Sequence, residues 1–320
     1  MPITEDVNLI YKVAVKFYVE GQSQVEIAQS ENLSRATICR LLRAAREMDM
    51  VHIDVSMPKA PPPSPRIAED LARALKLSEV IVAPAAPGDT NEETLLRSTV
   101  ATAAAHMPRL IADSYMVGVG WGRSVYRTAL QLPYTKGSKK LFIPLVNNFA
   151  YTVPALQTSV IMSYFGERFN SNCYYLNIAH QPRKKGERTE AELENIRQLT
   201  VFWNALDAAI FSLSSPEQLL SSEIYSSHWE GGLDVERPDE QSMRFECMGQ
   251  VYCEDGSYVG VNKNYDLIAL DLKRLRNIKK SICIGSGLKK VKSLIYAARL
   301  GFYNVLITDS VTASAMLEEV

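Results

Sequence analysis

Hydrophobic positions recur at helical spacing through the first fifty residues and predict three short helices. Apolar residues return every three or four positions from Asp6 to Val19, which favours a first helix that ends near Gly21. The segment Ser23–Glu26 has the sequence of a capping box and predicts a second helix through Ser30. Asn32, which tolerates positive φ, lies in the turn before a third helix over residues 34–49.

The third predicted helix has one apolar face and one arginine-bearing face. Ser34 occupies its N-cap position, and its apolar stripe at i, i+3, i+4 and i+7 is Ile38, Leu41, Leu42 and Ala45. Ala28 and Leu33 are placed to share this small core, an arrangement typical of a helix-turn-helix. Arginines and small hydroxyl residues suit phosphates and base edges, so we expect DNA contacts from Gln24, Ser34, Arg35, Ala36, Thr37, Arg40 and Arg43. The alternative is a three-helix bundle that serves only oligomerisation.

Beyond residue 66 the pattern alternates between helix and strand periods. It predicts strands at 79–83, 115–119, 140–145, 173–176, 208–213, 250–252, 281–284 and 304–308, and helices at 66–75, 92–109, 124–132, 156–165, 190–205, 289–300 and 310–318. This alternation is typical of an α/β fold with a mainly parallel sheet covered on both faces. Ligands of such sheets bind beyond the carboxyl ends of the strands.

A proline-rich segment separates the two patterns. Residues 56–66 contain five prolines, which are incompatible with a helix interior or a central strand. We interpret residues 58–66 as a semi-rigid linker between a helix-turn-helix domain, 1–57, and an effector and oligomerisation domain, 67–320. The alternating residues 51–55 predict a strand in the position of a wing.

Composition excludes several classes of protein. A chain of 320 residues with 47% hydrophobic residues can bury the cores of two domains. It has no run of about 18 apolar residues and no signal-peptide pattern, so we expect a cytoplasmic protein without a membrane partner. The five cysteines are scattered without a C-x-x-C motif and the four histidines are dispersed. We therefore expect buried free thiols, no metal site and no cofactor.

Charge is placed on the predicted recognition helix and not spread over its domain. The whole chain has a net charge of −1, and residues 1–57 carry six Lys/Arg against eight Asp/Glu. Four of these six cations lie on the third helix. A single copy neutralises few phosphates and should bind DNA weakly, which indicates an assembly of several copies.

Three loops at predicted strand ends have the chemistry to bind an anion or a polyol. Val117–Ser124 runs from a strand through three glycines into a helix start with Arg123 and Ser124. Gly285–Lys290 repeats that arrangement with two lysines, and Asp309 or Ser310 is placed to cap the last helix. The alternatives are a tight packing turn for the first loop and a solvated lysine run for the second.

Signatures of catalysis are weak. The chain has no G-x-S-x-G, H-E-x-x-H or Walker motif, and its acidic residues do not cluster recognisably. The basic run Arg183–Arg188 precedes a capping-box start at Thr189 and is expected to form an exposed loop. Trp203, Trp229 and Phe211 are expected in a core or an interface.

Three parts of the sequence are distinctive: Gly21–Ala28 with Leu33–Leu42, then Gly118–Ser124, and Asn304–Ala313. With these as its most specific matches, nearly the whole chain resembles the SorC family of sugar-responsive bacterial transcriptional regulators. The resemblance implies an N-terminal DNA-binding domain and an effector domain similar to sugar-phosphate isomerases and glucosamine-phosphate deaminase, without catalysis. It also implies a dimer of dimers whose operator binding responds to a phosphorylated sugar.

Carried over by position, the resemblance assigns the effector site. Its predicted residues are Gly120, Gly122, Arg123, Ser124, Asn147, Asn148, Glu246 and Lys290. The chain departs from the family pattern where Asn147-Asn148 replaces a glycine pair, Ser212–Ser214 replaces a G-I-G loop and Phe245 replaces a glycine. Larger side chains on these loops narrow or reshape the pocket, which leaves a non-standard or unphosphorylated sugar or a polyol as an alternative ligand.

Three hypotheses follow for the function. The leading one is a DNA-binding transcriptional regulator, not an enzyme, whose operator affinity responds to a sugar, sugar phosphate or polyol. The second is an active isomerase or deaminase of the same fold fused to a DNA-binding module. The third is an effector domain that binds nothing and serves as an oligomerisation scaffold.

Overall fold

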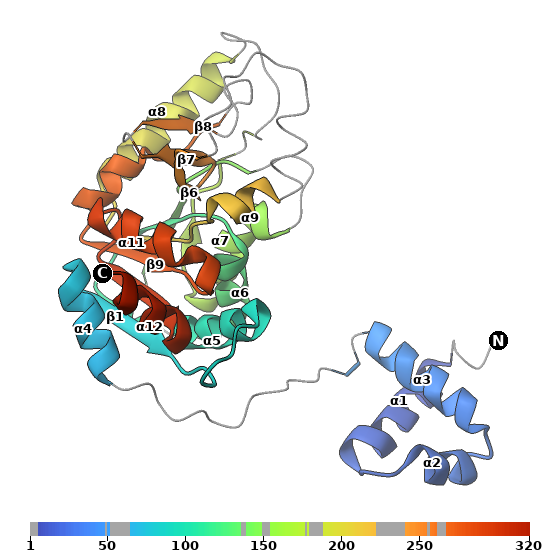
Figure 1. Ribbon diagram of the computed structural model, residues 1–320. Coiled ribbons are helices and arrows are strands. Elements are labelled where there is room, and N and C mark those ends of the chain that lie inside the picture. The colour runs from blue at the N-terminus through green and yellow to red at the C-terminus, as the bar shows by residue number, and fades with distance from the viewer. Residues whose placement is uncertain are drawn as a thin grey trace. The chain divides into compact units, whose positions relative to one another are not determined.

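The computed structural model describes residues 6–48, 50–51, 65–135, 139–148, 154–176, 178, 188–221, 241–254, 257–260 and 267–320. The chain separates into two compact units, Met1–Lys59 and Ala60–Val320 (Figure 1). The predicted strand at 51–55 and the linker at 58–66 lie outside the described residues, apart from Val51, Pro65 and Arg66. The same holds for residues 183–187 and for Trp229.

The N-terminal unit contains the three predicted helices. They are α1 Val7–Ala14, continued by one π-helical turn η2 Val15–Val19, α2 Gln24–Ser30 and α3 Arg35–Glu47. The capping box of Ser23 and Glu26 is present, Asn32 has a φ of 54°, and the Ser34 side chain caps α3. These features confirm the predicted helix-turn-helix geometry. The core consists of residues from all three helices: Ile10, Val13, Ala14, Ile27, Ile38, Leu41, Leu42 and Ala45.

The π-helical turn is the one departure from the expected single helix over 6–19. The Glu20 N–H donates to the Val15 carbonyl at 3.0 Å, five residues back. This wider turn keeps Phe17 and Tyr18 packed on the core, with their rings edge to face. The apolar spacing of the segment fits both helix types, so the pattern did not distinguish them.

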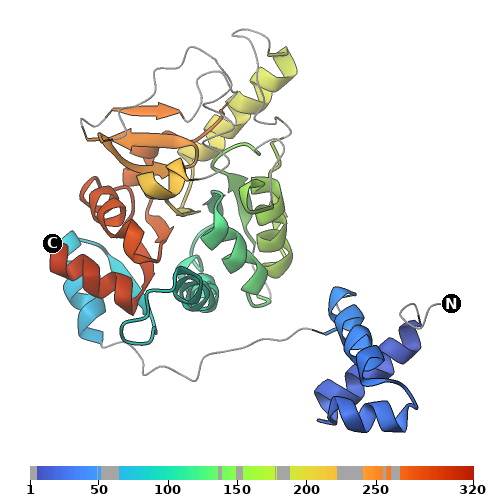
Figure 2. The ribbon, with the colours of Figure 1, turned by 45° about the vertical axis from the view of Figure 1, so that its right-hand side comes forward.

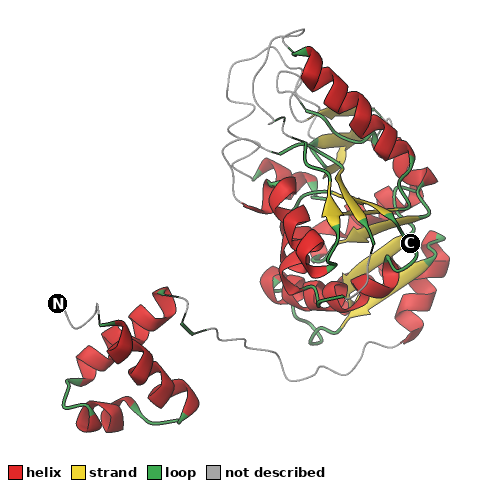
Figure 3. Cartoon of the chain, turned by 180° about the vertical axis from the view of Figure 1, so that it is seen from behind, coloured by secondary structure: helices red, strands yellow, loops and turns green. Residues whose placement is uncertain are grey.

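The larger unit is built on a seven-stranded parallel sheet of order β1-β10-β9-β5-β2-β3-β4. Its strands are β1 Glu79–Ala83, β2 Met116–Val119, β3 Leu141–Pro144, β4 Asn172–Cys173, β5 Ala208–Phe211, β9 Lys280–Ile284 and β10 Val305–Asp309. The main helices are α4 Pro65–Leu75, α5 Glu92–Leu110, α6 Arg123–Gln131, α7 Thr158–Arg168, α8 Glu190–Asn204, α11 Val291–Arg299 and α12 Ser310–Glu319. Helices cover both faces of the sheet (Figure 3), as the alternating pattern predicted.

A second, three-stranded antiparallel sheet lies beside α9 and α11 (Figure 2). It contains β6 Met243–Cys247, β7 Gln250–Cys253 and β8 Tyr258–Gly260, and α9 covers Pro216–Leu220. The sequence predicted only β7. Met248 and Gly249, both at positive φ, form the tight turn between β6 and β7.

Several predicted boundaries need correction. Pro65, which the prediction places in the linker, is the first residue of α4, a position that suits proline, and Arg66 is helical as the predicted helix over 66–75 has it. The helix predicted at 156–165 begins at Thr158, after a 3-10 turn η3 Pro154–Leu156, and the one predicted at 289–300 begins at Val291, after η5 Leu288–Lys290. A further 3-10 helix, η4 Leu272–Asn277, was not foreseen. The strand predicted at 173–176 is the two-residue strand β4, Asn172–Cys173, so only Cys173 of the predicted segment is in it.

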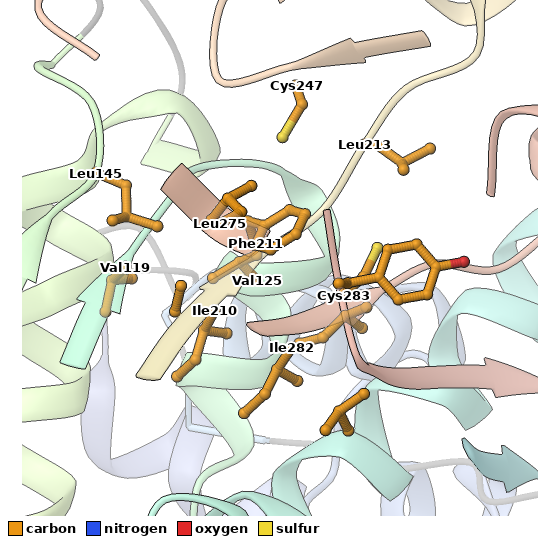
Figure 4. Close-up of a cluster of buried hydrophobic side chains, with 14 of the residues drawn as sticks. Val119, Val125, Leu145, Ile210, Phe211, Leu213, Cys247, Leu275, Ile282 and Cys283 are labelled. Carbon is orange, nitrogen blue, oxygen red and sulfur yellow. The ribbon is translucent and has the colours of Figure 1, made fainter. Parts of the chain in front are cut away.

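The centre of the large sheet is apolar on both faces, which explains its uninterrupted hydrophobic strands. Ile210 and Phe211 on β5 and Ile282 and Cys283 on β9 lie side by side in this core (Figure 4). Trp203 is buried too, and its indole N–H donates to the Pro144 carbonyl at 2.8 Å. The core assignments of Trp203 and Phe211 are therefore confirmed.

All five cysteines are described and are free thiols. Cys247, Cys253 and Cys283 are buried as expected, and Cys173 is half-buried. The expectation of burial is wrong for Cys39, which is exposed. Its position on α3 points away from the apolar stripe of residues 38, 41, 42 and 45.

Candidate DNA interface and effector site

The outer face of α3 is open to solvent. Ser34, Arg35, Ala36, Arg40 and Arg43 are exposed, and Thr37 is half-buried. Ser34 Oγ accepts from the Thr37 N–H at 3.1 Å and lies 2.8 Å from Thr37 Oγ1. Arg40 in turn donates to Thr37 Oγ1 at 3.4 Å. Gln24, the remaining predicted contact, is half-buried in the first turn of α2. The predicted residues thus lie at the start of α2 and along α3 from its N-cap to its third turn.

Ion pairs inside the unit separate its cations into two groups. Lys12 and Lys16 on α1 both bind Glu31, at 2.8 and 2.5 Å, and these bonds lower the pKa of the Glu31 carboxyl. Arg35, Arg40, Arg43 and Arg46 have no ion pair within the described part of the chain. The cations available to a polyanion are therefore those of α3, although the unit as a whole is acidic.

The second candidate site lies at the carboxyl edge of the large sheet. From β2 the chain proceeds outward to β3 and β4, and it then returns to the other side of β2 with β5. This reversal is a topological switch point, where open α/β sheets bind their ligands. The loops after β2 and β5 meet here, because the Ser212 hydroxyl donates to the Trp121 carbonyl at 3.3 Å.

Gly122 shapes the first of these loops. Its φ is +120°, and a Cβ at this position would lie 2.3 Å from Ser212 Oγ, so only glycine fits. Gly120 is packed under Met248 and Phe211. The backbone N–H of Gly122 donates to the Ala155 carbonyl at 2.8 Å and is not free for a ligand.

The start of α6 retains unused donors. Among the described residues, nothing accepts from the backbone N–H of Arg123, Ser124 or Val125, or pairs with the Ser124 hydroxyl. Ser124 is buried, whereas Arg123 is exposed. The nearby first residue of α7, Thr158, also has a buried hydroxyl without a partner. Free N–H groups and a helix dipole at one place favour an anion.

Glu246 and Lys290 come together with Arg123 from distant parts of the sequence. Burial raises the pKa of the Glu246 carboxyl, although the Gly249 N–H at 2.7 Å, the Ser214 hydroxyl, Lys290 and the Trp121 indole favour its ionised form. Burial lowers the pKa of the half-buried Lys290, and Arg123 lowers it further. Lys290 Nζ donates to the Leu213 carbonyl at 2.6 Å. Glu246 and Lys290 thus already have hydrogen-bond partners within the chain, among them the backbone groups of Gly249 and Leu213.

Both asparagines of the predicted site support the backbone. Asn147 is buried, and its Oδ1 accepts from the Ile268 N–H at 3.1 Å. Asn148 Oδ1 accepts from the Ser159 N–H at 2.9 Å and caps α7 from outside the helix. These contacts occupy one acceptor of each side chain, and their role toward an effector stays a prediction.

The sequence did not single out Trp121, Ser214 or Thr158 as site residues. Ser214 exchanges two backbone hydrogen bonds with Glu246, both 2.9 Å, which fixes the β5–α9 loop on β6. The sequence signal for Ser214 is the tripeptide 212–214, which departs from the family pattern. The described residues contain no cluster of side chains suited to a metal ion. Of the described helices, none is long and apolar enough to cross a membrane.

Comparison with known proteins agrees with this architecture. The family model described as "Putative sugar-binding domain" matches residues 64–318. The sorbitol operon regulator of Klebsiella pneumoniae is 22% identical, and the alignment covers 99% of this chain and 100% of that protein. The deoxyribonucleoside regulator of Bacillus subtilis is 26% identical, with 98% and 99% covered.

A solved structure shares the fold along the entire chain. The crystal structure of the full-length sorbitol operon regulator SorC from Klebsiella pneumoniae superposes with a TM-score of 0.66 at 21% identity, and covers 98% of this chain and 99% of that one. The curated relatives are named as regulators. With its sugar-binding domain model and its helix-turn-helix unit, the chain belongs to the SorC family of transcriptional regulators.

Proposed function

We propose that the chain is a DNA-binding transcriptional regulator whose operator affinity is set by a sugar, sugar phosphate or polyol bound at the carboxyl edge of its large sheet. The observation that carries this proposal is the meeting of Arg123, Glu246 and Lys290 at the switch point between β2 and β5. These residues come from three segments far apart in sequence, and Glu246 and Lys290 both bind the loop after β5, at Ser214 and Leu213.

The chemistry of the site supports a ligand with an anionic end and a hydroxyl-bearing end. The unused N–H groups at the start of α6, the Ser124 hydroxyl and the Arg123 guanidinium suit a phosphate or a carboxylate. The buried carboxyl of Glu246 suits a sugar hydroxyl, because a carboxyl group binds a hydroxyl in either protonation state. Lys290 lies close to both groups.

Effector binding requires an exchange of partners. Lys290 already binds the Leu213 carbonyl, and Glu246 already binds the Gly249 N–H. A ligand that recruits either group releases the β5–α9 loop or the β6–β7 turn. Such a ligand binds two arrangements of these loops with different affinity, and this difference is the condition for coupling to DNA.

The N-terminal unit is the part of the regulator that binds DNA. Four arginines of α3 without a described acidic partner contact operator DNA, with Ser34 and Thr37 on the same face. Few phosphates are neutralised by one copy, so binding depends on a homo-oligomer, a dimer of dimers in our proposal. The protein acts in the cytoplasm, where its DNA is found.

A second candidate function is catalysis by the same site. The pKa of the Glu246 carboxyl is raised and that of the Lys290 ammonium is lowered, which are the directions that acid–base catalysis uses. We favour a regulator without catalysis, because these groups have structural partners and the relatives are named as regulators.

A ligand screen on the full chain tests the proposal. Sugars, sugar phosphates and polyols are screened by thermal shift, and each hit is added to a binding assay with duplex DNA from upstream of the protein's own gene. A hit that changes DNA affinity and is not consumed supports the regulator. Turnover of the hit supports the enzyme, and the absence of any thermal shift supports a scaffold that binds nothing.

A further inference from the structure

The larger unit contains a strongly basic stretch, and apart from Lys290 its cations are not among the residues assigned to the effector site. Between Asp271 and Asp309 the chain has nine Lys/Arg and no Asp/Glu, although its overall net charge is −1. Lys280, Lys289 and Lys290 from this stretch bind carbonyl groups or carboxylates. Arg276, Lys279 and Arg299 are exposed and have no ion pair to a described residue.

Hydrogen bonds place these cations at one edge of the sheet, opposite the effector site. Asn304, just before β10, donates from Nδ2 to the Lys279 carbonyl at 3.0 Å. Its own carbonyl accepts from the Ser78 N–H at 2.8 Å, which brings the α4–β1 turn and the exposed Lys76 to the same place. The amino ends of β1, β10 and β9 therefore share one basic edge.

Arg276 and Arg299 extend this edge over the adjoining loops. The Arg276 guanidinium lies 5.1 Å from the centre of the Phe302 ring. A Cβ at Gly301 would be 3.7 Å from Arg276 Cγ, so the turn two residues after Arg299, the last residue of α11, lies against the Arg276 side chain. We call Lys76, Arg276, Lys279 and Arg299 the basic edge.

Three acidic side chains of the neighbouring segments have ion-pair or hydrogen-bond partners within the chain. Glu79 forms an ion pair with Arg109. Asp207 accepts from the N–H groups of Tyr115 and Met116, both at 2.9 Å. Asp271 accepts from the Lys273 N–H at 2.9 Å and caps η4. The charge of Glu79 is compensated by Arg109, whereas Asp207 and Asp271 are bound to neutral N–H groups and keep their charge. The four cations of the basic edge outnumber these two carboxylates, so the local potential is positive.

We propose that the basic edge is a second contact surface for the phosphate backbone of DNA. The inference rests on the proposed DNA-binding function. It is argued from charge complementarity: the N-terminal unit is acidic apart from α3, and a backbone contact adds affinity without sequence information. In this proposal the larger unit adds affinity that does not depend on the DNA sequence, and α3 supplies the sequence specificity.

The test compares salt dependence in full-length variants. One variant combines Lys76→Gln, Arg276→Gln, Lys279→Gln and Arg299→Gln. A matched control combines Arg66→Gln, Arg73→Gln, Arg97→Gln and Arg197→Gln, which remove the same charge from exposed positions on α4, α5 and α8. Affinity for upstream duplex DNA and for a random duplex of equal length is measured over a series of salt concentrations. If the fourfold variant does not fold, the same measurements are made on a double variant, Lys76→Gln with Lys279→Gln.

We expect the slope of log affinity against log salt to become shallower by about 0.9 for each phosphate that the variant no longer neutralises. Both duplexes should lose affinity by the same factor, while the control keeps the wild-type slope. A wild-type slope in the basic-edge variants overturns the proposal, as does an equal change in the control. Binding to anionic lipid vesicles that the variants lose, with DNA binding unchanged, also overturns it. Wild-type chain that binds neither duplex would instead refute the proposed function itself.

Discussion

The two candidate sites differ in whether their charged side chains already have partners within the chain. On α3 the arginines face solvent without a described acidic partner, while the neighbouring lysines 12 and 16 are held by Glu31. At the carboxyl edge of the large sheet, Glu246 and Lys290 are shielded and bound to backbone groups. An exposed site binds its partner by adding contacts. A site whose polar groups already have internal partners binds a ligand only when those hydrogen bonds are replaced, and we expect this replacement to move the loops that carry them.

This difference assigns separate roles to the two regions. The α3 surface supplies affinity and has no internal bond to break beyond the contacts of Ser34, Thr37 and Arg40. The sheet edge supplies response, because its internal bonds connect β2, β5, β6 and η5. Variants of each region test whether the two differ in this way, from the largest expected effect to the smallest.

The combined change Arg35→Ala and Arg40→Ala should abolish operator recognition. Each specific arginine contact is worth about 1–3 kcal/mol, so two of them correspond to at least roughly a thirtyfold loss of affinity. The thermal unfolding of the protein should not change, since both side chains are exposed. A matched control, Lys12→Gln, removes a cation already bound to Glu31 and should leave affinity nearly unchanged. Equal losses in the two variants would contradict the assignment of α3.

Alanine substitutions on the two faces of α3 should differ in their effect on the free energy of unfolding. Ile38→Ala removes a fully buried side chain and should lower the free energy of unfolding of the N-terminal unit by about 2–5 kcal/mol. Cys39→Ala, one position away on the exposed face, should change it by less than about 0.5 kcal/mol. Denaturant unfolding followed by circular dichroism gives both values. A comparable cost at both positions would show that the predicted faces are misplaced.

Gly122→Ala should distort the sheet edge. The positive φ and the close approach to Ser212 together should cost about 1–3 kcal/mol in the free energy of unfolding. Gly88→Ala is the control, because Gly88 has a φ of +76° but nothing within 4 Å of its Cβ position. This control introduces only the backbone strain, so its cost should be smaller. Adding Ser212→Gly to Gly122→Ala should recover part of the stability, and a lack of recovery would remove the contact from the explanation.

Glu246→Gln should have a small effect that depends on pH. The folded-state pKa of Glu246 is raised, so the ionised carboxylate costs stability above that pKa, and the cost disappears as the pH falls to the ordinary value of 4.5. The substituted amide carries no charge and can still accept from the Gly249 N–H. The variant should gain stability relative to the wild type at pH 8 and lose that advantage toward pH 5. A difference that does not vary with pH would argue against the raised pKa.

Much of the fold was predictable because local rules agree with the global structure. The capping boxes at Ser23 and Thr189 and the N-caps at Ser34 and Asp309 are short-range patterns that tertiary contacts did not override. The parallel strands were found because residues buried on both faces form continuous apolar runs. The missed elements, β6, β8 and α9, are short, and β6 places Glu246 in a buried position where the pattern predicts an apolar residue.

The candidate site was less accessible to sequence reasoning. The loop over 118–124 and Lys290 were found from glycines and charges at strand ends, and Glu246 only through a family resemblance. Asn147 and Asn148 illustrate what remained hidden, because an amide gives no sign in the sequence that it binds the backbone of residue 268 or caps α7. Glu246 and Lys290 each bind the loop after β5, at Ser214 and Leu213, and these contacts join segments far apart in sequence, which no local pattern contains.

The most direct test of the account is an anisotropy titration of upstream duplex DNA with the full chain, with and without the sugar or sugar phosphate identified by thermal shift. It is made for the wild type and for Lys290→Met. We predict that the effector changes the wild-type Kd at least about fivefold, the lower range of allosteric coupling. Lys290→Met should bind DNA as tightly as the wild type without effector and should not respond to it. An equal response in the variant, or a wild-type Kd that no effector changes, would contradict the proposed switch.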